Sequence, residues 1–463
     1  MKPTDSHRNI TVLVTLAIAG VGLVSAAPAQ GGNPTLPAAV MKEIRSDIIR
    51  KNIDTLAGFG TRHTLSSADD PARGIGAARQ WLLQQFEDSM RSIPGQPMMR
   101  TYMESFEQPP VERMPTGGII ANVVAVIPGT MPEAASRRYY ICAHYDSMPT
   151  GKLDSTSDAP GANDNASGTA AVLEIARVLA SRPLESTVVC LATAGEEQGL
   201  LGAIWHAGAA LDRGDDIRAV LNNDIVGDPS PAADGNPGPH KSVIRVFSEG
   251  LPSNLRTMQL AELRRLASES DSPSRQIARY IREVAQREST AVQPKLVFRP
   301  DRFLRGGDHL SFNDRGFAAV RFTAMGEDYT RQHQNVREEN GTKFGDRPEH
   351  VDADYLAEVT RLNAAVLVHL ANAPREPANV RIITAKLENG TTLRWERCPE
   401  PDTAGYEVVW RDTTSPYWEH AKDVGNVTEA RLDISKDNVF FGVRAYDKDG
   451  YKSPVSFAGA ALE

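Results

Sequence analysis

The chain has 463 residues. A single hydrophobic core rarely organises a chain of this length, so the length predicts two domains. The formal net charge is −8 with acidic and basic residues interspersed, which excludes the basic face that a nucleic-acid-binding protein needs. Three cysteines are too few for a fold built on disulfides.

The first thirty residues differ in composition from the rest of the chain. Lys2 and Arg8 precede an apolar run over residues 10–24, which ends in small residues. This order predicts a secretory signal peptide over residues 1–29, cleaved near Ala27 or Ala29. The run is shorter than the roughly 20 residues that cross a bilayer. We therefore expect a secreted or periplasmic mature protein with no stable membrane anchor.

Residues 36–372 alternate between helical and strand patterns. Apolar stripes at helical spacing predict helices within residues 36–58, 77–86, 169–180, 201–211, 274–288 and 354–370. Apolar or alternating runs predict strands at 98–106, 119–127, 138–144, 187–193, 219–224, 242–248, 295–298 and 318–323. This alternation predicts an α/β domain whose central sheet is mixed but mostly parallel, with helices on both faces.

Cys142 and Cys190 both lie within predicted buried strands. Small buried thiols are the expected state of these residues, and a disulfide between them is the alternative. Cys398 lies in the second domain, where we expect a free thiol.

The sequence pattern changes from alternating helices and strands to short strands after a Pro-rich linker at residues 373–379. Short alternating runs separated by turn signals then predict a small antiparallel β-sandwich over residues 380–463. The segment has a tryptophan in its second run, Trp395, followed by a third run, GYEVVWR, and a closing hairpin, AYDKDGYKSP. In these features it resembles a fibronectin type III domain.

Polar motifs follow the predicted strands of the α/β domain where each strand ends. They are HYDS with His144, GANDNASG with Asp164, the pair Glu196 and Glu197 after VVCLATAG, LNNDIVG with Asp224, and RQHQN with His333. An open α/β sheet carries its chemistry at the carboxyl ends of its strands. Together the motifs supply nitrogen and oxygen ligands for two divalent metal ions.

Each motif also has a structural interpretation. Asp164 could cap the following helix, and the two glutamates could form a solvated acidic helix start. Adjacent carboxylates after a buried strand repel each other unless a cation or a shared proton compensates this repulsion, which favours a metal.

Asp146 lies two residues after His144, so its carboxylate is expected to hydrogen-bond the imidazole. Asp308 and His309, in GGDHLSF, are expected to line the pocket or orient ligands.

The motifs HYDS, GANDNASG, the Glu pair, NND and GGDHLSF resemble the M28 family of zinc aminopeptidases over roughly residues 36–370. The resemblance implies two Zn²⁺ per chain. One would be held by His144, Asp164 and Asp224, and the other by Asp164, Glu197 and His333. Glu196 would be the general base and acid. A cis peptide bond from Asp164 to Asn165 is implied as well.

One departure concerns the oxyanion. Some secreted members of the family carry a tyrosine directly before the last histidine, whereas this chain has Gln332 there. Tyr329 is the candidate substitute.

The function expected from the resemblance is that of a secreted metallo-exopeptidase acting on peptides with a free N-terminus. Alternatives are a carboxypeptidase or dipeptidase of the same fold, which Arg302, Arg305 and Arg331 would favour, a glutaminyl cyclase, or an inactive binding protein. The sandwich is expected to bind a protein or polysaccharide surface or to act as a spacer. Deletion after Pro374 is then expected to spare hydrolysis of a small substrate.

Overall fold

The computed structural model describes residues 35–90, 98–236, 238–385 and 388–460. The predicted signal peptide lies outside these ranges, and residues Leu36–Glu463 form one compact unit. Within the described ranges, no helix combines the length and the apolar composition that crossing a membrane requires.

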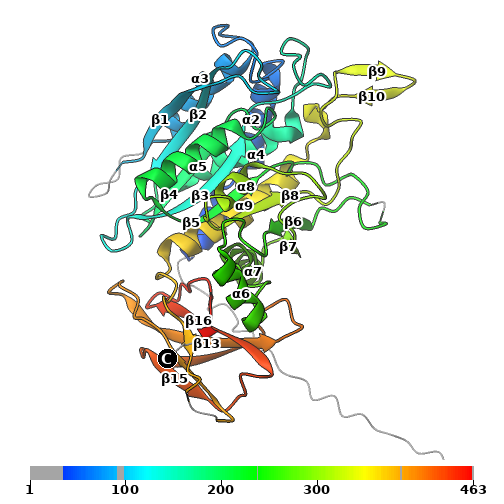
Figure 1. Cartoon of the computed structure of the whole chain (residues 1–463). Coiled ribbons are helices and arrows are strands. Elements are labelled where there is room, and N and C mark those ends of the chain that lie inside the picture. The colour runs from blue at the N-terminus through cyan, green and yellow to red at the C-terminus, as the bar shows by residue number, and fades with distance from the viewer. Residues whose placement is uncertain (1–34, 91–97, 237, 386–387, 461–463) are drawn as a thin grey trace, which may run out of the picture. The chain divides into compact units, whose positions relative to one another are not determined.

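The α/β part is built on an eight-stranded sheet with the order β1-β2-β4-β3-β5-β8-β6-β7 (Figure 1). Its strands are β1 (Arg100–Gln108), β2 (Gly118–Ile127), β3 (Arg137–His144), β4 (Thr187–Thr193), β5 (Asp216–Asn223), β6 (Val243–Ser248), β7 (Gln293–Val297) and β8 (Ala319–Thr323). The pairs β3–β4, β3–β5, β5–β8 and β6–β7 are parallel and the other neighbours antiparallel. The predicted mixed, mostly parallel sheet is confirmed.

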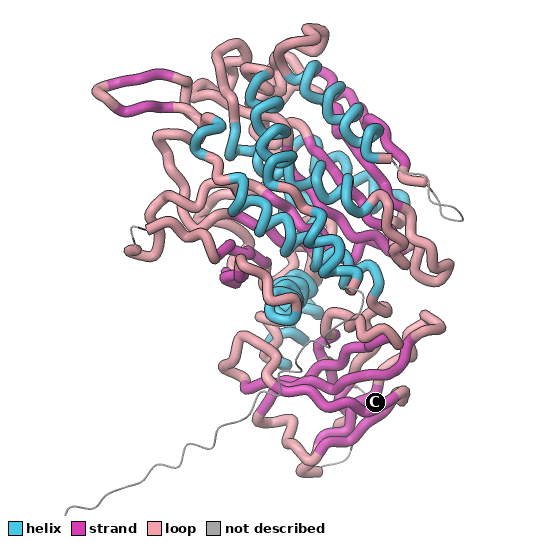
Figure 2. The backbone as a smooth tube through the Cα atoms, turned by 180° about the vertical axis from the view of Figure 1, so that it is seen from behind, coloured by secondary structure: helices cyan, strands magenta, loops and turns pink. Residues whose placement is uncertain are grey.

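Helices cover both faces of this sheet (Figures 1 and 2). One face packs against α1 (Leu36–Glu43), α2 (Ser46–Gly58), α3 (Ile75–Ser89), α4 (Gly168–Leu179), α7 (Pro273–Arg287) and α9 (Ala353–Asn372). The other face packs against α5 (Leu201–Arg213) and α8 (Asp308–Asn313). The strands between the two layers are buried on both sides, which explains their continuous apolar runs.

Several elements differ from the sequence prediction. The helix predicted over residues 36–58 is two helices, α1 and α2. Helix α6 (Thr257–Leu266) was not predicted, and none of its side chains is buried. Helix α8 and the hairpin of β9 (Arg337–Glu339) and β10 (Thr342–Phe344) are too short to give a periodic pattern.

The cysteines are all free and buried, so Cys142 and Cys190 do not form the alternative disulfide. Burial raises the pKa of Cys190 to about 12, which keeps its thiol protonated and inert.

The C-terminal part consists of two four-stranded sheets, β15-β12-β11-β18 and β14-β13-β16-β17. The strands are β11 (Arg381–Ile382), β12 (Thr391–Arg394), β13 (Thr403–Asp412), β14 (His420–Gly425), β15 (Glu429–Leu432), β16 (Val439–Asp447), β17 (Ser456–Phe457) and β18 (Gly459–Ala460). Trp395, Tyr406 and Phe441 lie in the core between them. The prediction of all-antiparallel pairing needs one correction, because β11 and β18 run parallel. The likeness to fibronectin type III stays a prediction.

Buried ion pairs join the two parts of this unit. Arg137 at the start of β3 and Glu400 before β13 are both fully buried, with Nη1 and Oε1 3.1 Å apart. Asp271 pairs with both Arg279 of α7 and Arg411 of β13. Breaking a buried pair by removing one partner costs about 3–5 kcal/mol. Deletion after Pro374 would leave Arg137 unpaired, so such a truncation is a poor test of whether the sandwich takes part in hydrolysis.

Candidate metal centre

The predicted site residues converge because of the strand order. Strands β4, β3, β5 and β8 are consecutive parallel neighbours, so their carboxyl ends lie along one edge of the sheet. His144 is the last residue of β3, and Asp224 directly follows β5. Glu196 and Glu197 come three and four residues after β4, across a turn at Gly195 with φ +74°. His333 arrives from the loop after β8.

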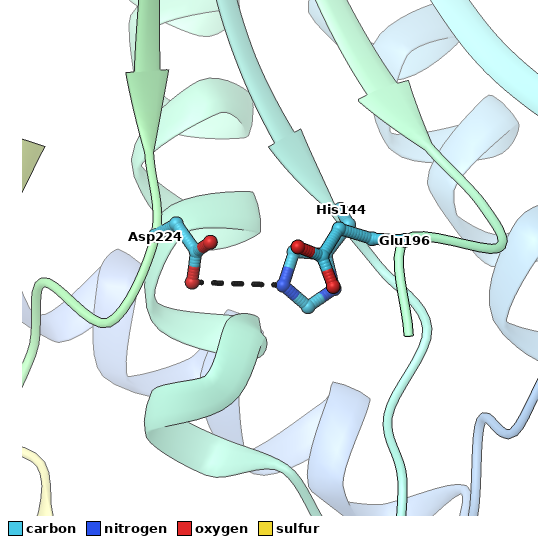
Figure 3. Close-up of side chains that lie close together, drawn as sticks. All are labelled: His144, Glu196 and Asp224. Carbon is cyan, nitrogen blue, oxygen red and sulfur yellow. Dashed lines mark ion pairs between the residues drawn. The ribbon is translucent and has the colours of Figure 1, made fainter. Parts of the chain in front are cut away.

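One cluster consists of His144, Glu196 and Asp224, whose ligand atoms all lie within 4.8 Å of one another. Figure 3 shows the Asp224 carboxylate and the Glu196 carboxylate next to the imidazole of His144. Nε2 of His144 lies 3.6 Å from Oδ1 of Asp224 and 3.2 Å from Oδ1 of Asp164. Nδ1 donates to the carbonyl oxygen of Asp146 at 3.2 Å, which leaves Nε2 free to bind a cation.

A second cluster consists of Asp164, Glu197 and His333, whose ligand atoms also lie within 4.8 Å of one another. Nε2 of His333 lies 3.0 Å from Oδ2 of Asp164 and 2.9 Å from Oε1 of Glu197. Asp164 therefore directs one carboxylate oxygen to each imidazole. A carboxylate in this position can bridge two cations.

Several buried polar atoms at this place have no hydrogen-bond partner within the described part of the chain: Nε2 of His144, Nε2 of His333, Oδ1 of Asp224 and Oε1 of Glu197. Buried polar atoms are normally satisfied, and these four converge on two points. Imidazole nitrogens and carboxylate oxygens are donors that zinc accepts. The residues present therefore fit two zinc ions that share Asp164.

The electrostatics of the cluster are those of a cation site. Burial opposes charge on both imidazoles, yet the carboxylates around them, Glu196 for His144 and Glu197 for His333, raise the pKa of each well above its usual value. Burial also raises the pKa of Glu196 well above its ordinary range, and the neighbouring Asp224 and Glu197 add to this. The excess of negative charge is what a divalent cation would neutralise.

The loop that carries Asp164 is fixed against strand β5. It forms the turn Ala162–Ser167, and the peptide bond between Asp164 and Asn165 is cis, as the resemblance implied. Nδ2 of Asn165 donates to the carbonyl oxygen of Asn223 at 2.9 Å. A Cβ added at Gly168 would lie 2.1 Å from the same oxygen, so this approach requires glycine. Asp164 and Asp224 are held together through these contacts.

Arg62 holds the other side of that loop. Its fully buried guanidinium donates to the carbonyl oxygens of Tyr145, Pro160 and Gly161. Burial lowers its pKa to about 10, which still leaves it charged near neutrality. Arg62, in the segment FGTRHT at residues 59–64, thus orients the segment before Asp164.

Asp346 is a buried residue that sequence reasoning missed. Its carboxylate accepts the backbone N–H groups of Asn163 and Asp164, the latter at 2.7 Å. No motif marks it, because it lies in a loop far along the chain from the ligands it supports. It is a positioning residue for the carboxylate of Asp164.

We expect Asp346→Ala to lower zinc affinity about ten- to a hundredfold, the usual effect of losing a group that orients a ligand. The two N–H groups would lose their acceptor, at about 1–3 kcal/mol each. Titration against a competing chelating dye measures the affinity. Asp346→Asn keeps one acceptor oxygen and should lose less. If the alanine variant binds zinc like the wild type, Asp346 does not position Asp164.

Asp146 contacts the imidazole differently from the prediction. Its carboxylate Oδ1 lies 3.6 Å from Nδ1 of His144, too far for a hydrogen bond, and the backbone carbonyl takes that place. The carboxylate instead accepts the backbone N–H groups of Glu196 and Glu197. It fixes the turn that presents both glutamates.

Asp308 and His309 both lie buried behind the cluster. Thr193 donates to the carboxylate of Asp308, whose pKa burial raises to about 7. Nε2 of His309 donates to the carbonyl oxygen of Pro300 at 2.8 Å. Neither residue belongs to either ligand cluster among the described residues.

Arg321 of β8 contacts Asp224, and this contact was not predicted from the sequence. Its fully buried guanidinium lies 3.1 Å from Oδ2 of Asp224 and 3.0 Å from Asp301. This leaves Oδ1 of Asp224 to face His144. A lone arginine in the apolar strand AVRFT is a signal that could have identified this residue, since buried arginines are almost always paired.

A cavity of about 740 Å³ opens over the two clusters. Asp164, Glu196, Glu197, Asp224 and His333 line its floor, together with Gln332. Nε2 of Gln332 donates to Oδ2 of Asp164 at 2.9 Å. Tyr329 is 65% exposed, stands beside Arg305 and is not among the lining residues, so the structure does not bring it to the site.

Comparison with known proteins identifies the family. The profile of peptidase family M28 matches residues 122–367. A probable zinc metalloprotease of Leptosphaeria maculans is 42% identical over 95% of this chain and 99% of that protein. One from Pyricularia oryzae is 42% identical over 90% of this chain and 83% of that protein. The solved aminopeptidase from Aneurinibacillus sp. strain AM-1 is 13% identical, covers 73% of this chain and 96% of that chain, and has a TM-score of 0.49.

The profile covers the strands and loops that carry all six predicted ligand and base residues, from His144 to His333. The likeness to the Leptosphaeria maculans protein, over 95% of this chain, extends beyond the profile into the C-terminal sheets. The chain belongs to peptidase family M28 and is a zinc metallopeptidase.

Proposed function

We propose that the protein is an aminopeptidase that uses two zinc ions to hydrolyse the N-terminal bond of peptides. The observation that carries this proposal is the bridging position of Asp164 between His144 and His333, with Glu196 beside the first of them. Zinc at these positions would supply Lewis acidity to the scissile carbonyl and make a nearby water more acidic.

Glu196 is the residue we assign to proton transfer. Its side chain is partly exposed to the cavity, whereas Glu197 is buried and faces His333. The carboxylate of Glu196 lies in the cluster with His144 and Asp224, where it can take a proton from the attacking water. It can then return that proton to the amine that leaves.

The acidic floor of the cavity favours a substrate with a free N-terminus. Carboxylates there can hold the α-ammonium group beside the scissile bond, which positions the carbonyl over the metal ligands. Arg302 and Arg305 also line the cavity, but both donate to Oε2 of Glu327. Arg331 pairs with Asp228 and Asp328 and does not line it.

A dipeptidase or carboxypeptidase is the second candidate, because Arg113 and Lys152 also line the cavity. Nη1 of Arg113 donates to the carbonyl oxygen of Glu197 at 2.9 Å, so its charge lies near the second cluster. Either cation could receive the carboxylate of a short substrate.

A panel of dipeptides and longer peptides, each with a free or acetylated N-terminus and a free or amidated C-terminus, separates the candidates. We expect acetylation to abolish cleavage and amidation to leave it within a few fold. Cleavage of acetylated substrates at the rate of free ones would contradict the aminopeptidase proposal, and loss of cleavage on amidation would favour the second candidate.

Two further parts of the proposal concern the ends of the chain. We propose export to the cell exterior or periplasm after removal of residues 1–29, on the evidence of their composition alone. We also propose that the C-terminal sandwich binds a protein or polysaccharide surface. Nucleic acid is not a proposed partner.

A further inference from the structure

Three carboxylates converge away from the zinc centre, where the α/β part meets the sandwich. Glu185 lies in the loop between α4 and β4, Asp402 precedes β13, and Asp447 is the last residue of β16. One oxygen from each lies within 4.8 Å of the others. Glu185 is more than 200 residues from the two aspartates in the sequence, so the fold alone brings them together.

One oxygen of each acid is buried and has no hydrogen-bond partner within the described ranges. Asp447 is only 3% exposed. Its Oδ1 accepts the backbone N–H groups of Asp449 and Tyr451, while Oδ2 has no hydrogen-bond partner within the described ranges. The same holds for Oε2 of Glu185 and Oδ1 of Asp402. The unpartnered Oδ2 of Asp447 belongs to a residue that is only 3% exposed and lies close to two further carboxylates, an arrangement that a bound cation satisfies.

No protein cation fills that role in the described part of the chain. None of the three acids forms an ion pair with a Lys, Arg or His there. Arg137 is the basic residue whose charge acts on Glu185, but its Nη1 pairs with Glu400 and its Nη2 donates to the carbonyl oxygen of Ala373. Burial raises the pKa of Glu185 to about 8, and the neighbouring Asp402 and Asp447 add to this rise.

We propose that Glu185, Asp402 and Asp447 form a calcium site that joins the sandwich to the α/β part of the chain. The ligand set is oxygen only, which suits a hard cation and not zinc. Calcium–oxygen distances of about 2.3–2.6 Å allow two ligands of one ion to be at most about 5 Å apart, and the cluster meets that limit. This inference does not depend on the proposed aminopeptidase activity.

The test uses the full-length, zinc-loaded protein freed of calcium by passage over a chelating resin. Calorimetric titration with CaCl₂ should give one site, and calcium at about a hundred times its Kd should raise Tm by roughly 3 °C. Tb³⁺ should replace calcium and be sensitised by the ring of Tyr451, whose backbone N–H binds Asp447. An equal response to MgCl₂ would overturn the calcium assignment.

Matched variants locate the site. Asp402→Asn, which keeps the shape of the side chain, should abolish the calcium-dependent rise in Tm and the Tb³⁺ signal. Asp433→Asn in the same sandwich, with a side chain 88% exposed, should keep both. Asp164→Asn should also keep both, since it lies in the zinc centre. No calcium binding by the wild type, or a full response in Asp402→Asn, would overturn the proposal even if one variant failed to fold. The three acids would then share a proton instead.

Discussion

Glu196→Gln is expected to lower kcat by about a hundred- to ten-thousandfold while the protein keeps its full zinc content. General acid–base catalysis contributes about that factor, and glutamine fills the same volume without accepting a proton. Glu196 lies in the first cluster with His144 and Asp224, so geometry alone would also allow it to be a metal ligand. Activity and zinc content, measured on the same preparation, distinguish the two roles.

The matched control for this variant is Glu339→Gln, whose carboxylate is 59% exposed and pairs with Arg337. It should retain wild-type kcat. If Glu196→Gln loses one zinc per chain together with its activity, Glu196 is a ligand and the base must be sought elsewhere. If it keeps full activity and full zinc, the proposed role of Glu196 is wrong.

Asp164→Asn is expected to have the second large effect, with at least one zinc lost per chain and activity reduced about a thousandfold or more. The amide offers one oxygen where the carboxylate offers two, so it cannot bridge. Metal catalysis is worth several kcal/mol, and each 1.36 kcal/mol is a factor of ten in rate. Elemental analysis after gel filtration gives the zinc content, and hydrolysis of an unblocked dipeptide gives the rate.

Asp54→Asn serves as the comparison, since that carboxylate is 54% exposed and lies 3.8 Å from Arg50. Adding excess zinc to Asp164→Asn should not restore the rate. Recovery of wild-type activity under zinc would mean that bridging by Asp164 is dispensable.

Much of the metal centre could be predicted from the sequence because most of its residues follow strands. His144, Glu196, Glu197 and Asp224 stand at or shortly after the ends of apolar runs, and parallel strands bring such ends to one edge. Asp164 lies in the glycine-bounded turn before α4. The order of the strands could not be predicted, because pairing such as β5 with β8 joins segments about a hundred residues apart.

The supporting residues were harder to predict for a physical reason. Asp346 and Arg62 act through backbone N–H and carbonyl groups, and such contacts leave no pattern of residue types. Asp146 has its role through Glu196 and Glu197 and not, as expected, through a carboxylate–imidazole bond. Tyr329 is close to His333 along the chain, but such proximity does not determine where an exposed loop side chain points.

The central claim is that two metal ions share Asp164 at the carboxyl edge of the sheet. Anomalous diffraction at the zinc edge, from crystals of the zinc-loaded protein, tests it directly. We expect two peaks about 3.5–4 Å apart. One should lie against His144 and Asp224, the other against Glu197 and His333, with the Asp164 carboxylate between them. A single peak, or two peaks of which only one contacts Asp164, would contradict the claim.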